Sequence, residues 1–141
     1  MAYTNPGPAV ATTIHPQGVT SNQAIRLLGV ATGVNLGATG DAVAIPVANT
    51  TNYSVYQVIF TNASASLSSA YAGVWTAPNK GGNNIVANAA LSANTSAPVV
   101  SQATVATTNT QSSQNLYVNV GTAQAATVDV YIYGYDFSTY N

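Results

Sequence analysis

The sequence predicts an all-β fold: an antiparallel β-sandwich, jelly-roll-like, preceded by an extended N-terminal arm. Three observations predict it. Short segments alternate between apolar and polar residues, turn-forming residues separate them, and no helical pattern extends beyond two turns. Seven to nine short strands fit within the 141 residues, a length typical of one domain. Such a series of strands favours a sandwich over a closed barrel.

Residues 1–22 are predicted to form the arm. They contain Pro6, Pro8 and Pro16 and show no sustained periodicity. Proline removes a backbone donor and favours extended conformations in the residue before it, so this segment should lie along a surface or run free. We expect its ordering to depend on a partner. The sandwich domain then comprises residues 23–141.

The first strands of the domain are expected in three segments. Residues 24–31 could form a strand or a short helix, and Gly29 favours the strand because it interrupts a helix too early. In residues 43–47 apolar and small side chains alternate, and Pro46 places this strand at an edge or a bulge. Residues 53–61 carry β-branched and aromatic side chains on both faces, which predicts a central strand covered on both sides.

The middle of the chain is predicted to contain shorter strands. Residues 67–77 alternate as a strand, and a loop containing Gly81 and Gly82 precedes a short strand at 85–87. A further strand is expected around 98–105. Tyr71 and Trp75 should share one strand face, and the core is favoured over a contact role for both rings.

The last two strands have the clearest alternation, at residues 115–121 and 127–135. The short segment between them predicts a hairpin, with the two aliphatic rows side by side against the core. The other face would carry a tyrosine row, either as the inner face of a second sheet or as a surface for another chain. The candidate interface residues are Tyr117, Tyr131, Tyr133, Tyr135, Phe137 and Tyr140.

The charge is unusually low. Only 4% of the residues are charged, compared with about 25% in a typical soluble domain. A net charge of −1 gives little repulsion between copies, so we infer a permanent assembly, although a neutral polar surface is the alternative. Two cationic side chains cannot support binding to nucleic acid or to an anionic membrane surface. The first residues show no secretory pattern, which predicts synthesis in the cytosol.

No catalytic, metal-binding or cofactor-binding pattern is present. The sequence has no cysteine and no glutamate, and its one histidine, His15, lies in the predicted arm. The three aspartates, Asp41, Asp129 and Asp136, show no spacing of a calcium loop or of paired catalytic carboxylates. We therefore expect no enzyme activity, no cofactor and no metal.

Two blocks of sequence resemble small structural proteins of tailed bacteriophages, a group that includes capsid decoration or cement proteins. The first comprises residues 60–67 and 72–82, with Gly73-Val74-Trp75-Thr76-Ala77-Pro78, and the second residues 116–124 and 129–135, with Asp129-Val130-Tyr131-Ile132-Tyr133. The resemblance covers roughly the C-terminal two-thirds of the chain, and the group has no catalytic signature. It implies a β-sandwich that sits on a capsid lattice, often as a homotrimer.

The favoured hypothesis is a cement protein on the outer capsid surface of the virion, with the major capsid protein and its own copies as partners. Its arm would extend along neighbouring subunits. The alternative is a receptor- or glycan-binding module of a phage tail or fibre, in which exposed Tyr and Trp rings stack on sugars. A virion enzyme such as a glycosidase is disfavoured because acids are scarce.

Overall fold

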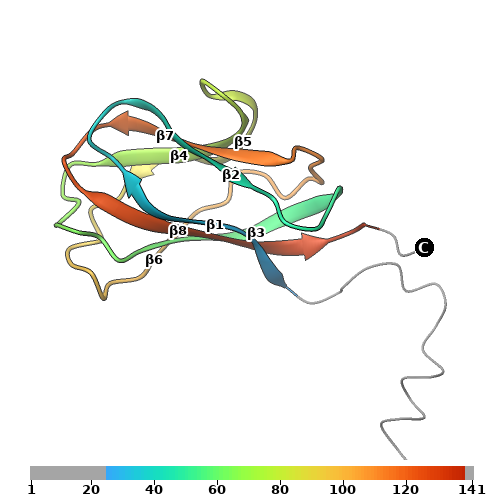
Figure 1. Cartoon of the computed structure of the whole chain (residues 1–141), viewed down its shortest axis with the longest axis horizontal. Coiled ribbons are helices and arrows are strands. Elements are labelled where there is room, and N and C mark those ends of the chain that lie inside the picture. The colour runs from blue at the N-terminus through green and yellow to red at the C-terminus, as the bar shows by residue number, and fades with distance from the viewer. Residues whose placement is uncertain (1–24, 139–141) are drawn as a thin grey trace, which may run out of the picture.

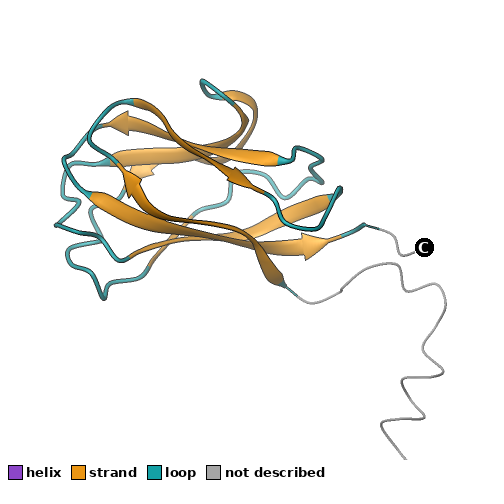
Figure 2. Cartoon of the chain, viewed as in Figure 1, coloured by secondary structure: helices purple, strands orange, loops and turns teal. Residues whose placement is uncertain are grey.

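The computed structural model describes residues 25–138, and this part of the chain contains eight strands and no helix (Figure 2). The predicted arm, residues 1–22, lies outside the described residues, as do His15 and Tyr140. The strands are β1 Arg26–Asn35, β2 Gly40–Pro46, β3 Tyr53–Thr61, β4 Tyr71–Ala77, β5 Gly81–Ala90, β6 Ser101–Ala103, β7 Asn115–Thr122 and β8 Thr127–Asp136.

The strands form two antiparallel sheets that stack as the two layers of a sandwich (Figure 1). Sheet A has the order β1-β8-β3-β6 and sheet B the order β2-β7-β4-β5. The prediction of an all-β antiparallel sandwich is confirmed. Pro46 ends β2 at the edge of sheet B, as its missing backbone donor predicts.

The order of pairing is that of a jelly roll. β1 pairs with β8, β2 with β7, β3 with β6 and β4 with β5, which are the four nested pairs of one long folded hairpin. Rolling this hairpin adds two further pairings, β8 with β3 and β7 with β4, and closes the two sheets over one core. Each sheet therefore combines strands that lie far apart in the sequence.

The core lies between the sheets and receives alternate side chains from every long strand. β7 contributes Leu116, Val118 and Val120, and β8 contributes Val128, Val130 and Ile132, all almost completely buried. The predicted hairpin of these two strands is wrong, because β7 belongs to sheet B and β8 to sheet A. Their connection crosses from one sheet to the other, so the two aliphatic rows face each other across the core.

Several expected strands differ in detail. β3 is an interior strand of sheet A, but its outer face is covered only in part: Ser54 is 6% exposed and donates to the Thr108 carbonyl, whereas Tyr56 is 51% exposed. β4 begins at Tyr71 rather than at residue 67, since Leu67 is buried in the preceding loop. A turn at residues 78–80 joins β4 directly to β5, which is longer than the short strand predicted at 85–87.

Trp75 is buried, but outside the core between the sheets. It is 8% exposed, whereas its neighbours Ala72 and Val74 point into the core. The indole lies on the outer face of sheet B over Gly73, where a Cβ atom would come within 2.6 Å of the ring. Lys80 covers it, with Nζ 5.8 Å from the ring centroid. Tyr71 shares this face but is 41% exposed, so the core prediction is wrong for Tyr71.

Candidate functional site: an aromatic face on sheet A

The outer face of sheet A carries the tyrosine row of β8. Because Val128, Val130 and Ile132 point inward, the alternation of the strand turns Tyr131, Tyr133 and Tyr135 outward. All three rings are half-buried. This row is therefore not the inner face of a second sheet, which was one of the two possibilities left by the sequence.

Side chains of the flanking strands extend the row on both sides, and they are apolar except for Gln57, which lies opposite Tyr133 on β3. Residues opposite each other in an antiparallel pair share a face. On β1, Leu27 lies opposite Tyr133 and Val30 lies opposite Tyr131. On β3, Ile59 lies opposite Tyr131. Leu27 is 40% exposed and Val30 is 41% exposed, so the apolar surface continues to the edge of the sheet.

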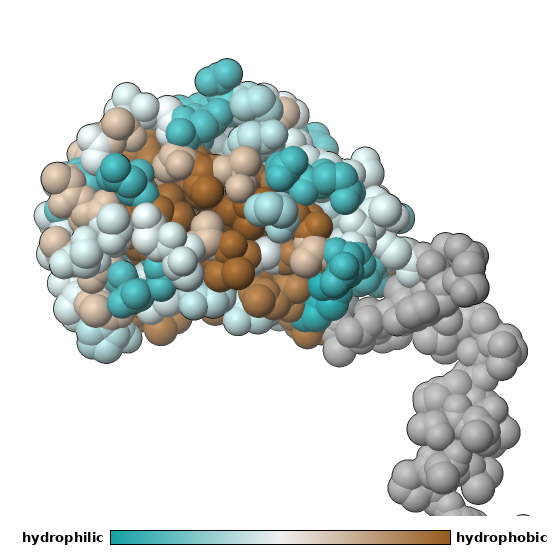
Figure 3. Space-filling view, viewed as in Figure 1, coloured by the Kyte–Doolittle hydropathy of each residue, from teal (hydrophilic) through white to brown (hydrophobic). Residues whose placement is uncertain are grey.

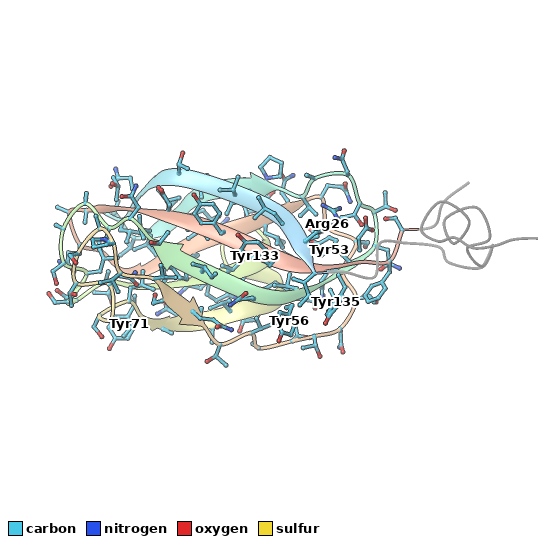
Figure 4. All side chains as sticks on the ribbon, turned by 90° about the horizontal axis from the view of Figure 1, so that it is seen from below. Arg26, Tyr53, Tyr56, Tyr71, Tyr133 and Tyr135 are labelled. Carbon is cyan, nitrogen blue, oxygen red and sulfur yellow. The ribbon has the colours of Figure 1, made fainter. Side chains whose placement is uncertain are left out.

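Ring contacts continue the face toward the end of β8. Tyr56 packs edge-on against Tyr135, with ring centroids 5.9 Å apart, and Tyr135 stacks with Phe137 at 6.2 Å. Phe137 is 40% exposed. Figure 4 shows Tyr56, Tyr133 and Tyr135 on this side of the molecule, with Tyr71 near its other end. We call the surface formed by these residues the aromatic face: Leu27, Val30, Tyr56, Ile59, Tyr131, Tyr133, Tyr135 and Phe137.

A β-bulge places Tyr56 on this face. The register of β3 against β8 shifts between Val55 and Gln57, so Tyr56 is the extra residue. Tyr53 and Val55 point inward before the bulge, and Val58 points inward after it. Without the bulge, Tyr56 and Val58 would share a face. The bulge therefore turns Tyr56 outward to Tyr135 while keeping Val58 in the core.

An ion pair and its hydrogen bonds border one end of the aromatic face. Arg26 Nη2 lies 3.1 Å from Asp136 Oδ2 and also donates to the carbonyl of Ala48 at 2.7 Å. Thr50 Oγ1 donates to Asp136 Oδ1 at 2.6 Å, and the Ser138 amide donates to the same oxygen at 2.9 Å. Burial acts to raise the pKa of Asp136, but the hydrogen bonds from Thr50, Ser138 and Arg26 outweigh it and lower the pKa to about 2.

The other charged side chains also have partners inside the fold. Asp129 accepts hydrogen bonds from the Gly33 amide at 2.7 Å and from Asn62 Nδ2 at 3.0 Å. Asp41 accepts from Asn119 Nδ2 and from the Asn79 amide, each at 2.7 Å. Together with Lys80 over Trp75, all five charged residues of the chain are therefore engaged. None of the residues of the aromatic face is charged, and Asp129, which precedes the tyrosine row on the same side of β8, is only 8% exposed.

The predicted interface residues divide between two surfaces. Tyr131, Tyr133, Tyr135 and Phe137 lie together on the aromatic face. Tyr117 was expected nearby, but it lies on β7 in sheet B, opposite Trp75, so this expectation is wrong. Tyr140 lies outside the described residues.

Sequence reasoning missed the apolar residues of β1 and β3, namely Leu27, Val30, Ile59 and Tyr56. Their strands were predicted, and the missing information was which strands flank β8.

Apolar side chains also gather where edge strands β1 and β2 lie, in the middle of the surface seen in Figure 3. Ile25, the first described residue, directly precedes β1 and is 42% exposed. The apolar surface thus reaches the point where the described chain begins.

A small pocket opens on the opposite side of the sandwich, between the end of β5 and β6. Its volume is about 200 Å³. Its walls are mostly small or apolar side chains. The lining residues are Phe60, Ala72, Val86, Ala89, Ala90, Leu91, Ala93, Ser101, Gln102, Ala103 and Thr104.

Residues 25–138 bring together no group of three or more His, Cys, Asp or Glu side chains that could hold a metal ion. Within the same range, no helix is long and apolar enough to cross a membrane. Comparison with family models, with curated proteins and with solved structures finds no match to this chain. The candidate site is therefore defined by the geometry of the aromatic face alone.

Proposed function

We propose that this chain is a bacteriophage capsid decoration, or cement, protein that binds the outer capsid surface and stabilises the shell through contacts between subunits. It acts without catalysis or a cofactor, in the virion, after synthesis in the host cytoplasm. Its partners are the major capsid protein and its own copies, arranged as a homotrimer, rather than nucleic acid or a membrane. The resemblance of residues 60–67, 72–82, 116–124 and 129–135 to phage structural proteins supports this proposal, as does the jelly-roll order, which recurs in viral capsid domains.

The aromatic face is the observation that carries the proposal. An uncharged, partly exposed apolar surface on one side of a sandwich normally marks a binding surface. Tyrosine suits such a surface because its ring can be buried while its hydroxyl stays hydrated. The paired charges Arg26 and Asp136 lie at its border, so docking would not strip water from an unpaired ion.

The size of the face sets the affinity to expect. The face spans three strands, β1, β8 and β3, which lie about 4.8 Å apart and are about 33 Å long, so it covers roughly 480 Å². A stable protein–protein interface of standard size buries about 800 Å² on each partner. One face is therefore a modest interface, and several copies joined to one another would bind a lattice more tightly because their contacts add. Opening the shell would then require several such contacts to break together.

A receptor- or glycan-binding module of a phage tail or fibre is the second candidate. The exposed rings of Tyr56 and Phe137 favour it, because aromatic rings can stack on sugars. This candidate predicts binding to carbohydrate in the absence of any capsid. Trp75 would not take part, since its ring is covered by Lys80.

A matched pair of tyrosines tests the proposal. Tyr56 is 51% exposed on sheet A, and Tyr71 is 41% exposed on sheet B. The full chain is incubated with shells assembled from the major capsid protein, and the bound fraction is measured by co-sedimentation. We expect Tyr56→Ser to weaken binding at least about tenfold, a loss of about 1.4 kcal/mol. Tyr71→Ser should leave binding unchanged.

If Tyr56→Ser and Tyr71→Ser weaken capsid binding equally, the aromatic face is not the docking surface. No binding by the unsubstituted chain, combined with a positive signal on a glycan array, would replace the proposal with the second candidate. Thermal unfolding of each variant shows whether the substitution has altered the fold rather than the contact.

A further inference from the structure

The described chain begins where its exposed apolar side chains are concentrated. Seven large apolar side chains are exposed among residues 25–138, and four of them, Leu27, Val30, Tyr56 and Phe137, belong to the aromatic face. A fifth, Ile25, directly precedes β1, the strand that carries Leu27 and Val30. The chain therefore enters the fold at the edge of the aromatic face.

One segment before Ile25 has the composition of a strand. Residues 9–14, Ala-Val-Ala-Thr-Thr-Ile, lie between Pro8 and Pro16 and are rich in β-branched side chains. Val10 and Ile14 fall on one side of this segment if it is extended. Residues 1–24 contain no Asp, Glu, Lys or Arg, so a contact between this segment and the aromatic face would bury no charged side chain.

The covalent connection puts this segment within reach of the whole aromatic face. Tyr133 lies opposite Leu27 and Tyr131 lies opposite Val30. Five residues of strand length, about 17 Å, and two strand spacings, about 10 Å, place the far side of the tyrosine row roughly 20 Å from the start of β1. The eleven steps from residue 14 to residue 25 span up to about 38 Å.

The same connection favours the chain's own segment over that of a second copy. A short tether holds a segment near its site at an effective concentration on the order of 1 mM. A second copy is present only at the concentration of the dissolved protein. At the micromolar concentrations of a binding experiment, the segment of the same chain therefore has the advantage.

The outer face of sheet B offers the segment no comparable surface. Trp75 is already covered by Lys80. Tyr71 is exposed, but Figure 4 shows it near the end of the molecule opposite to Arg26, the neighbour of Ile25. The aromatic face is therefore the apolar surface that lies beside the start of the described chain.

We propose that residues 9–14 lie on the aromatic face of their own chain in the free protein, with Val10 and Ile14 against the tyrosine row of β8. Capsid docking then requires this segment to leave the face, a step that rests on the proposed function. Because only molecules with an uncovered face can dock, the segment lowers the apparent affinity for the capsid. Once displaced, it is available to neighbouring subunits.

Disulfide closure within the full chain tests this contact, because the sequence contains no cysteine. The double variant Val10→Cys/Val30→Cys is oxidised at low concentration, and the rate of closure within one chain is measured by mass spectrometry. A disulfide forms only when the two Cβ atoms come within about 4.5 Å. Thr12→Cys and Ile14→Cys, each in place of Val10→Cys, cover the neighbouring registers.

Ala44→Cys in place of Val30→Cys is the matched control. Ala44 is exposed on β2 and lies opposite Tyr117, so it belongs to sheet B. It is within similar reach of the start of β1, since the Ala48 amide donates to the Leu28 carbonyl at 2.8 Å. We expect at least one pair with Val30→Cys to close about fivefold faster than the corresponding pair with Ala44→Cys.

Equal closure rates on the two faces at every register would overturn the proposal. Disulfide-linked dimers in place of closure within one chain would assign the aromatic face to a second copy, and would overturn it as well. These rates are measured without capsid shells, so their failure is distinct from failure of the proposed capsid binding.

A locked segment should also block docking. Oxidised Val10→Cys/Val30→Cys should bind capsid shells at least about tenfold more weakly than the same variant after reduction. The single variant Val30→Cys, treated in the same way, should bind equally before and after reduction. If the locked and reduced forms bind shells equally well, the segment does not compete with the capsid and the displacement is wrong. If the unsubstituted chain binds no shells, the proposed function fails, while the closure rates still decide where the segment lies.

Discussion

The guanidinium of Arg26 and the carboxylate of Asp136, 3.1 Å apart, join the first residue of β1 to the last residue of β8. The same carboxylate accepts hydrogen bonds from Thr50 and Ser138. One side chain thus holds together the start of the fold, the loop before β3 and the end of the described chain. Its titration should be visible in the stability of the whole domain.

Acid should destabilise the protein through Asp136. The pKa of this carboxyl is about 2 in the fold and 3.8 as a free side chain. The lowered pKa contributes stability above about pH 4, and this contribution disappears as the pH falls from about 4 to 2. We expect Asp136→Asn to lower the urea midpoint at pH 7 and to flatten its decline between pH 4 and 2. Parallel curves for the two proteins would contradict this role.

Alkali should destabilise the protein through Tyr53. Its hydroxyl donates to the Ser113 carbonyl at 2.7 Å, and burial raises its pKa from 10.0 to about 12. Stability from the neutral phenol is complete below pH 10 and is lost as the pH rises from 10 to about 12. Tyr53→Phe should cost about 1 kcal/mol at pH 7 for the lost hydrogen bond. Between pH 10 and 12, its unfolding free energy should fall less steeply than that of the unsubstituted protein.

Gly134 should not tolerate alanine. It lies in β8 between Arg26 of β1 and Val55 of β3, and an added Cβ would overlap the backbone carbonyl oxygen of Ser54. The Leu28 side chain, 2.7 Å from that Cβ position, could rotate away, but a carbonyl within a central strand pair cannot. Gly134→Ala should therefore cost about 1–3 kcal/mol. A change in the denaturation midpoint within experimental error would show that the sheet relaxes more easily than its pairing indicates.

Asn94 should be a strong stabilising residue although it lies in a loop. It is completely buried, donates to the Phe60 carbonyl at 2.9 Å and accepts from Ser101 Oγ at 2.5 Å. Asn94→Ala leaves buried polar groups unpaired and should cost about 1–3 kcal/mol. The exposed Asn52 is the control, since Asn52→Ala should change stability by less than about 0.5 kcal/mol. If chemical denaturation shows that the two variants lose similar amounts of unfolding free energy, the hydrogen bonds of Asn94 do not stabilise the fold as expected.

The strands and their inward faces follow from the sequence because alternation reports directly which side chains are buried. The sheet to which each strand belongs does not follow. β7 and β8 both bury aliphatic rows, and a short loop can join neighbours in one sheet or cross between two. The predicted hairpin was wrong for this reason, and with it the expected position of Tyr117.

Half of the aromatic face could also not be predicted from periodicity. A bulge shifts alternation by one residue without a marker in the sequence, so the outward position of Tyr56 depends on the pairing of β3 with β8. The position of Trp75 could not be predicted from periodicity either. Its burial on the outside of sheet B depends on the space over Gly73 and on Lys80 from the next turn.

The pairing of β1 with β8 has a consequence for how the chain reaches its native state. β8 is the last of the described strands in the sequence, but it lies between β1 and β3 in sheet A. The sheet therefore cannot form until β8 has been synthesised. Proteins dominated by such distant pairings fold in milliseconds to seconds. A nascent chain stalled before residue 127 would leave β1 and β3 without their shared neighbour, so sheet A should form only after β8 has emerged from the ribosome.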